Sequence, residues 1–546
     1  MFAVIFIVCA AILLAGYKFY GAFMAGVYKL DDSKPTPAER LNDNMDYVPT
    51  HPAILLGHHF SSIAGAGPIT GPILASSIFG WVPTLIWCMV GCVFLGGPHD
   101  MGALVASIRH DGNSVGVIIE KWIGKTGKKL FLCFTILTLV LVVAVFIAMT
   151  TGTFVADPVV AFVSCLYIVI AIIAGLCIYH FHANFKIVTV VMLIVVAYCS
   201  IYGGNWAWVT AVFTHDANFW NAFLGIYVLA ASTLPVWLLL QPRDYLASFF
   251  LYFAVIIGAI GMVLGSKFNS GMVPAFASNV TYLGMSSKAL WPCLFTMVAC
   301  GAISGFHSLV GSGTTAKQIS RETDALPIGY GSMLLEGIVA VIAVGTIMVA
   351  GTMMKGGPVP TFAAGFGKFA SLIGIDEKLG VRLGMIAVNT FLLTSLDTSN
   401  RLCRYQIQEI SNKKIGLFPA SLVPIILALC LVYVKTTDAS GKVIAAWAVI
   451  WPVFGASNQL VAAIALLSIG VWVIRGLKKR GRFLMIPFWF MICTSVFALI
   501  IGIYEEFAVK PSPNYLLSGI SVILIVLALL LVKDGLQAIK QDKTQG

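Results

Sequence analysis

The stretch GHHFSSIAGAGPITGP, residues 57–72, lies within a long apolar run. The residues in it that would unwind a helix are Gly65, Gly67, Pro68, Gly71 and Pro72. Proline removes a backbone donor and pushes the residue before it out of the helical region. Unpaired backbone groups cannot face lipid, so they must line a cavity that is buried in protein or filled with water. The stretch therefore predicts a broken helix at membrane depth.

The composition places this break in a polytopic membrane protein. Of the 546 residues, 59% are hydrophobic and 10% are charged, and the mean hydropathy is +0.94, which excludes a water-soluble domain of this size. Because a span needs roughly 20 apolar residues, we expect an all-α fold with about fifteen transmembrane helices. The expected spans are 3–27, 53–79, 82–108, 130–153, 158–179, 185–203, 219–240, 246–266, 290–322, 329–354, 383–402, 416–434, 443–473, 484–506 and 515–533. The second and ninth are interrupted, and Pro98 strains the third.

The placement of lysine and arginine predicts the orientation. Most of the 34 basic residues fall in alternate loops, which puts the amino terminus outside and the carboxyl terminus inside. This bias toward an anionic inner leaflet explains the net charge of +11, so the lipid bilayer is the expected partner and nucleic acid is not. No loop is long enough to hold a nucleotide-hydrolysing domain, and no phosphate-binding loop motif is present. We therefore expect no cofactor and no enzyme.

A second stretch echoes the first. FHSLVGSG at Phe306–Gly313 aligns without gaps on FSSIAGAG at Phe60–Gly67, although small residues are so common in membrane helices that eight positions leave coincidence open. On the expected topology the two copies run in opposite directions, as in secondary transporters that bind solute between paired broken helices. We expect a LeuT-like inverted-repeat core. The expected domains are a peripheral helix with an inner loop at 1–52, a first repeat with extra spans at 53–266, a second inverted repeat at 267–473 and a C-terminal helix hairpin at 474–546.

The two breaks predict a binding site for a solute. Half-helices that start near Ile69 and Thr314 would point their positive ends into the cavity, which favours a carboxylate. The candidate substrate-binding residues are Ser61, Ser62, Gly65, Gly67, His307, Ser308, Gly311, Ser312 and Thr314.

Ionisable residues inside apolar spans are candidates for ion coupling. These candidates are His58, His59, Asp100, Glu336 and Asp397. His58 and His59 are adjacent, so they project about 100° apart on a helix and cannot face one cavity. Glu336 is flanked by apolar residues, which favour the protonated form of its carboxyl group, so we expect it to be able to carry a proton. The competing interpretation for each of these three is a buried group that is hydrogen-bonded to a neighbouring helix.

Two of these candidates have neighbours that favour a structural role. Asp100 follows His99 at a bend marked by proline, where the two would form a charge-paired corner. Asp397 lies one turn before Arg401, a spacing that predicts a structural ion pair near the inner side. We interpret Arg243 as a topology anchor in a tight inner turn.

Five long motifs, spread over most of the chain, resemble the carbon starvation protein A family. They are DYVPTHPAILLGHHFSSIAGAGPITGP from Asp46, ISGFHSLVGSGTTAKQI from Ile303, IGYGSMLLE from Ile328, LDTSNRLCRYQIQE from Leu396 and PVFGASNQL from Pro452. The resemblance implies an inner-membrane secondary transporter related to the amino acid, polyamine and cation superfamily. It further implies uptake of peptides or, in some members, of pyruvate with protons.

We therefore expect an alternating-access importer of small carboxylate-bearing solutes, coupled to protons or alternatively to sodium. The residues leave open whether the solute is a peptide or pyruvate. The competing functions are a membrane-embedded metal-binding protein or enzyme, a divalent-metal transporter that uses the histidines, and a passive channel. No metal site is expected, because His180 and His182 have ligand-like spacing without a nearby carboxylate or thiol cluster.

Overall fold

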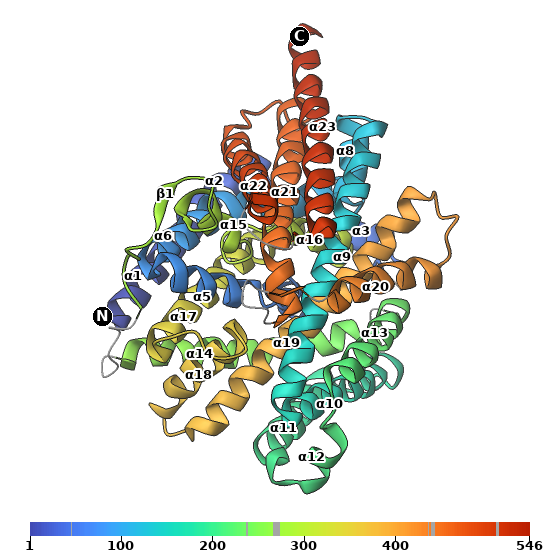
Figure 1. The fold of residues 1–546 in the computed structure, drawn as a ribbon. Coiled ribbons are helices and arrows are strands. Elements are labelled where there is room, and N and C mark those ends of the chain that lie inside the picture. The colour runs from blue at the N-terminus through green and yellow to red at the C-terminus, as the bar shows by residue number, and fades with distance from the viewer. Residues whose placement is uncertain are drawn as a thin grey trace.

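The computed structural model describes most of the chain. Apart from the side chains of residues 179, 241 and 542–545, the described residues are 1–44, 46–235, 238–265, 273–434, 436–437, 443–508 and 513–545. The fold is mostly helical (Figure 1), and twelve helices among these residues are long and apolar enough to cross a membrane.

The bounds of the elements follow the chain. The first half contains α1 (Phe2–Ala15), η1 (Gly16–Gly21), α2 (Ala22–Tyr28), α3 (Pro37–Arg40), α4 (Pro52–Ala64), α5 (Gly67–Phe79), α6 (Trp81–Gly91), η2 (Cys92–Gly96), α7 (Gly97–Ile108), α8 (Val115–Trp122), α9 (Lys125–Ala156), α10 (Pro158–Gly175), η3 (Leu176–His180), α11 (Phe185–Tyr202), η4 (Gly203–Asn205), α12 (Ala207–Phe213), α13 (Ala217–Thr233) and α14 (Leu240–Leu264). The second half contains β1 (Thr281–Leu283), η6 (Leu290–Leu294), α15 (Phe295–Met297), α16 (Gly305–Gly313), η7 (Thr315–Lys317), η8 (Glu322–Asp324), η9 (Leu326–Gly331), α17 (Ser332–Ala350), α18 (Pro358–Ser371), α19 (Glu377–Ile410), α20 (Leu417–Tyr433), β2 (Thr436–Thr437), β3 (Val443–Ile444), α21 (Ala446–Arg475), α22 (Arg482–Ala508) and α23 (Tyr515–Gln545). Strands β2 and β3 pair antiparallel.

The expected count of about fifteen spans stays a prediction, because three of the expected segments differ from simple long helices. The segment at 219–240 is helical only to Thr233, and the next helix begins at Leu240. The segment at 290–322 consists of short helices with a non-helical stretch at 298–304. The segment at 416–434 forms a shorter apolar helix, Leu417–Tyr433.

Local chemistry explains where several helices begin. Asp157 caps α10 by accepting from the N–H of Val159, and Pro158 occupies the first turn, where its missing donor costs nothing. Asp376 caps α19 in the same way by accepting from Leu379. Pro98 strains the third span without breaking it, because the π-helical turn η2 directly precedes α7 and the helical path continues.

Helix α9 is long, with 32 residues. It runs from the end marked by α8 to the end marked by α10 (Figure 1) and packs against α19, α20 and α21. The two halves α4 and α5 pack on different neighbours, α4 against α14 and α19, and α5 against α17 and α18. The junction between α4 and α5 therefore lies inside the bundle.

Candidate functional site

The first helix interruption is short. Helix α4 ends at Ala64, Gly65 has a φ of +45°, and α5 begins at Gly67. Only glycine adopts such a conformation without strain, so Gly65 is the residue that breaks the helix. The expectation that Pro68 and Pro72 unwind the chain is wrong: Pro68 lies in the first turn of α5 and Pro72 within it. A proline in the first turn removes only a donor that has no intrahelical partner, which is why the helix tolerates Pro68.

The second interruption lies upstream of its expected position. The chain is non-helical from 298 to 304, between α15 and α16. Gly311 lies inside α16, and only a single 3-10 turn follows Thr314, so the expected half-helix starting at Thr314 is absent. Glycine in a helix costs about 1 kcal/mol, which does not break a helix by itself.

The hydroxyl groups of α16 donate to backbone carbonyls of the same helix. Ser312 donates to the carbonyl of Ser308 at 2.7 Å, and Thr314 donates to the carbonyl of Val310 at 2.9 Å. The hydroxyl of Ser308 donates to the carbonyl of Gly305 at 2.8 Å. These three predicted substrate-binding side chains are therefore engaged within their own helix.

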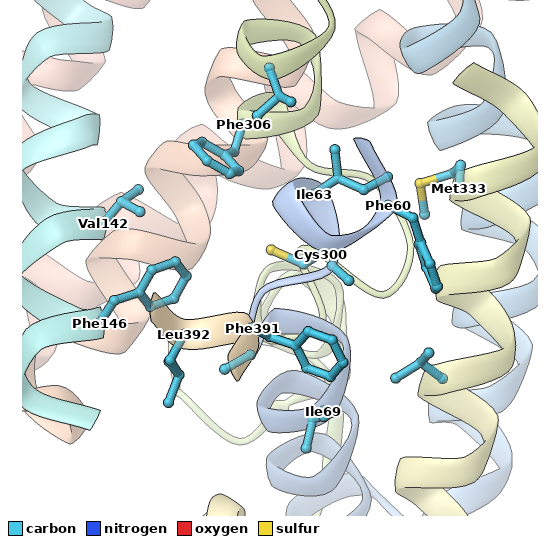
Figure 2. Packing of buried hydrophobic residues seen from close by; sticks show 14 of the residues in the cluster. Phe60, Ile63, Ile69, Val142, Phe146, Cys300, Phe306, Met333, Phe391 and Leu392 are labelled. Atoms are coloured by element: carbon cyan, nitrogen blue, oxygen red, sulfur yellow. The ribbon is translucent and has the colours of Figure 1, made fainter. Parts of the chain in front are cut away.

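The two interruptions lie against each other. A Cβ placed on Gly67 would lie 2.3 Å from the Cβ of Cys300, and one on Gly71 would lie 2.7 Å from the carbonyl oxygen of Met297. Figure 2 shows Cys300 beside the junction of α4 and α5, with Ile63 on one side and Ile69 on the other. The chain can approach this closely because Gly67 and Gly71 have no side chain.

Apolar side chains surround this junction. In Figure 2, Phe146 of α9 and Leu392 of α19 lie to the left of it, and Phe306 lies above it. A Cβ on Gly65 would lie 3.4 Å from the ring of Phe146 and 2.8 Å from the hydroxyl of Ser395. The same hydroxyl donates to the carbonyl of Ser62, at the end of α4, at 3.2 Å.

Polar side chains of α21 and α6 hold the second interruption in place, and sequence reasoning missed them. Asn458 accepts from the N–H of Phe306 at 2.9 Å and donates to the hydroxyl of Ser304 at 2.8 Å. Gln459 donates to the carbonyl of Phe295 at 2.6 Å, and the indole of Trp87 donates to that of Val298 at 3.1 Å. The adjacent Asn and Gln within an apolar helix were the available signal.

A buried chain of ionisable groups adjoins the second interruption. The carboxylate of Asp100 bonds Nδ1 of His99 at 2.6 Å and Nδ1 of His307 at 2.8 Å. Nε2 of His307 lies 3.3 Å from Oε2 of Glu336. All four side chains are at most 1% exposed. The expected corner between His99 and Asp100 therefore extends across three helices, α7, α16 and α17.

A second buried network joins α4 to three other helices. Nδ1 of His58 lies 2.9 Å from the carboxylate of Asp244, which also accepts from Arg243 at 2.6 Å. Arg243 bonds Asp397, and the hydroxyl of Tyr227 lies 2.5 Å from Arg243 and 2.6 Å from Asp397. These residues come from α4, α13, α14 and α19.

This network corrects two expectations. Asp397 pairs with Arg243 and not with Arg401, which donates instead to the backbone carbonyls of Ala231 and Leu234. Arg243 is not a topology anchor in a turn: it lies within α14, and its side chain is 2% exposed. A guanidinium from a neighbouring helix pairs with one oxygen of the carboxylate, so the one-turn spacing along α19 is not used.

The two adjacent histidines point to different partners, as their spacing predicts. Nδ1 of His59 lies 2.8 Å from the hydroxyl of Thr315, whereas His58 faces Asp244. The hydroxyl of Ser61 donates to the backbone carbonyl of Asp244 at 3.3 Å. Among the described residues, several buried polar atoms of these groups lack a hydrogen-bond partner: Nε2 of His58, His59, His99 and His307, the hydroxyl of Ser62, Oδ1 of Asp397, and both carboxylate oxygens of Glu336.

Within the described residues, no group of three or more histidine, cysteine or acidic side chains has the geometry to hold a metal ion. Of the predicted site residues, Ser62, Gly65 and Gly67 lie at the junction of the two interruptions. The two buried ionic networks contain His58, Asp100, His307, Glu336 and Asp397, and the other predicted residues lie in neither place. At the junction, the backbone of residues 65–67, the unpaired hydroxyl of Ser62 and apolar side chains lie close together. Buried carboxyl and imidazole groups, which are chemically able to carry a proton, lie in the networks nearby.

Comparison with known proteins identifies the family. The profile described as "Carbon starvation protein CstA" matches residues 2–355 and 346–498. The Peptide transporter CstA of Campylobacter jejuni is 31% identical over 92% of this chain and 79% of its own length. The Pyruvate/proton symporter BtsT of Escherichia coli is 30% identical over 90% of this chain and 80% of its own length.

Among solved structures, the Eremococcus coleocola manganese transporter covers 92% of this chain and 99% of its own, with a TM-score of 0.47 and 15% identity. The helices and these relatives together support a multi-pass membrane protein. The long family match and the identity to curated members confirm the resemblance carried by the sequence motifs. The chain belongs to the carbon starvation protein CstA family.

Proposed function

We propose that this protein is a secondary active transporter that imports a small carboxylate-bearing solute, a peptide or pyruvate, coupled to protons. The observation that carries the proposal is the meeting of two helix interruptions inside the bundle, beside the buried chain of Asp100, His307 and Glu336. The names of the relatives, peptide transporter and pyruvate/proton symporter, support the same substrate class.

An inverted repeat is part of the proposal. Helix α4 contacts α16, and α5 contacts α15, so the half-helices pair in reversed chain order. Two half-helix pairs related in this way allow one unit to rock against the other around a central solute. We assign α4 and α16 to the inner side and α5 and α15 to the outer side, in line with the distribution of basic residues.

The solute site that we propose lies at the junction of α4 and α5. Helix α5 has no side-chain cap at its N-terminus, so we propose that the N–H of Gly67 binds the carboxylate. Pro68 has no N–H, and the N–H groups of Ile69 and Thr70 donate to the carbonyl of Ala66. The unpaired hydroxyl of Ser62 offers a further hydrogen bond. Phe146 and Leu392 provide an apolar wall for the remainder of the solute.

The coupling proton is proposed to reside on the chain of His307 and Glu336. The carboxyl group of Glu336 makes no hydrogen bond to a described residue, although its Oε2 lies 3.3 Å from Nε2 of His307, and a buried carboxyl group in that state is far less costly when it is neutral. His307 lies in the first turn of α16, directly after the second interruption. A movement of α16 would therefore change the distance between His307 and Glu336, which links protonation to the transport cycle.

The network around Arg243 is proposed to hold the inner side closed. It ties α4 through His58 and Asp244 to α13 and α19. Opening toward the inside requires α4 to separate from these helices. Separating a buried ion pair costs free energy because each charge is left buried without its partner.

Uptake into proteoliposomes tests the function. Labelled pyruvate and dialanine are offered under separately imposed proton and sodium gradients. We expect an inward proton gradient to drive saturable uptake of at least one of them. In Glu336→Gln we expect the proton gradient to lose its effect while exchange of solute persists, because the amide cannot carry the proton.

Glu377→Gln is the matched control, since Glu377 is exposed at the start of α19. It should behave like the wild type. Non-saturating flux that ignores both gradients would identify a channel, and competition by divalent metals would identify a metal transporter. Proton-driven uptake by Glu336→Gln equal to that of the wild type would remove Glu336 from the coupling pathway.

A further inference from the structure

A cavity of about 430 Å³ lies apart from the helix interruptions. It lies between the ends of α9, α13, α19, α20 and α21 and the loop that precedes α18. The polar residues that matter in its lining are Thr151, Thr153, Asn221 and Lys355. The distribution of basic residues assigns every one of these helix ends to the outer face. Its volume is within the range of small-molecule sites.

Three helices lead from this cavity toward the first interruption. Thr153, Met385 and Trp447 line the cavity on α9, α19 and α21. Two turns further along each helix, on the same face and about 10 Å away, lie Phe146, Leu392 and Phe454.

These inner residues form a layer over the junction. The rings of Phe146 and Phe454 lie edge to face at 6.2 Å, and Phe454 also packs on Trp451 at 5.2 Å. Phe146 in turn contacts the position of Gly65. About two helical turns of side chains, with this aromatic and aliphatic layer at the inner end, therefore separate the cavity from the helix break.

The charge in the cavity lining is positive. Lys355 is exposed and makes no ion pair among the described residues. The two carboxylates that flank the lining are already engaged: Asp157 pairs with Arg382 at 2.9 Å, and Asp216 accepts from the N–H of Phe219 at 2.9 Å. Most of the remaining lining is apolar, with Asn221 and Thr151 bonded to each other at 2.7 Å. A small anion with a short apolar part fits these features.

We propose that this cavity is an outer capture site for the solute carboxylate, with Lys355 as its cationic partner. The inference rests on the proposed import function. It adds a second site, on the outer side of the aromatic layer, that the solute visits before this layer opens. An unpaired cation at a cavity mouth raises the local concentration of anions and its effect falls as salt is added.

Uptake kinetics of Lys355→Gln test the proposal with pyruvate as the probe. We expect the KM for pyruvate to rise by about fivefold, with the maximal rate unchanged, and Lys355→Arg to restore most of the loss. The KM of the wild type should increase with ionic strength, whereas that of Lys355→Gln should not. Lys378→Gln, an exposed lysine at the start of α19, is the control and should keep the wild-type KM.

A labelling experiment measures occupancy without relying on Lys355. Gly152 lines the cavity, and a Cβ added there meets no atom within 4 Å, so Gly152→Cys is tolerated. A charged thiol reagent added from outside should block uptake in this variant and not in the wild type, whose own cysteines report the background. Pyruvate should slow the labelling.

The outcomes separate the two proposals. If the wild type takes up neither pyruvate nor dialanine, the proposed function fails. If it takes up pyruvate but Lys355→Gln keeps the wild-type KM and pyruvate gives Gly152→Cys no protection, the capture site is overturned and the transport function stands.

Discussion

Phe60–Gly67 and Phe306–Gly313 have similar sequences and different structures. FSSIAGAG leads into a break at Gly65, whereas FHSLVGSG is helical along its whole length. A Cβ on Gly67 would lie 2.3 Å from Cys300, but one on Gly311 would meet no atom within 4 Å. The aligned glycines therefore do different things: Gly67 allows a close approach of two segments, and Gly311 leaves open space beside a helix.

The difference shows what breaks a helix in this fold. Both segments have glycines at the same spacing, so glycine content alone does not determine where a helix is interrupted. Gly65 takes a conformation that only glycine adopts easily, and the neighbouring hydroxyl of Ser395 holds the end of α4. The second interruption contains Gly301 between longer side chains, and side chains of α6 and α21 satisfy its backbone. Tertiary partners, more than local composition, fix each break.

Of the variants that compare the two segments, Gly67→Ala should reduce uptake the most. The added methyl group collides with Cys300, and overpacking of this kind costs about 1–3 kcal/mol. If that cost falls on the conformations that carry the solute, uptake falls by about tenfold or more. Proteoliposome uptake measures this, and size-exclusion chromatography checks that the variant folds and inserts.

The partner residue supplies the control for this variant. Cys300→Gly removes both side-chain atoms that would collide with the new methyl group, so the double variant should recover a large part of the uptake. Full uptake by Gly67→Ala alone would mean that the two interruptions separate during transport, and the site would then need to be placed elsewhere.

The sequence predicts the class of fold and the first break well, because both follow from local properties. Apolar run lengths predict membrane helices, and Gly65 marks the conformation that the chain needs. The break was predicted to be longer than it is, since the tolerance of α5 for Pro68 in its first turn depends on where the helix starts. The different directions of His58 and His59 followed from helix geometry and are confirmed.

The polar partners could not be predicted, because they come from distant parts of the chain. Asp397 lies one turn from Arg401, and no local pattern reveals that Arg243 of another helix takes its place. The bond between Asp100 and His307 likewise joins α7 to α16. The second interruption was misplaced because its cause is Asn458 and Gln459, which lie on α21.

Asn458→Ala tests whether the side chain of Asn458 on α21 supports the second interruption. It leaves the buried N–H of Phe306 and the hydroxyl of Ser304 without their partner. A lost hydrogen bond to a buried group costs about 1–3 kcal/mol. We expect a lower unfolding temperature in detergent and a several-fold loss of uptake, smaller than that of Gly67→Ala, since no atoms collide.

Ser457→Ala is the matched control, because that hydroxyl donates to the carbonyl of Phe454 within its own helix. Its unfolding temperature should stay close to that of the wild type. An unfolding temperature of Asn458→Ala equal to that of Ser457→Ala would show that the second interruption needs no support from α21.

Gly311→Ala should have the smallest effect of the three variants, and it should raise the stability of the fold where the other two lower uptake or stability. Alanine favours a helix over glycine by up to about 1 kcal/mol, and the added methyl group enters open space. We expect unchanged uptake and a slightly higher unfolding temperature. Gly313→Ala is the comparison within α16, since its Cβ would lie 2.4 Å from a terminal methyl group of Leu402, which must move. If Gly311→Ala folds normally but loses uptake, the space beside Gly311 is used by the solute or by a moving helix, and this result would support the sequence-based assignment of Gly311 to the binding site.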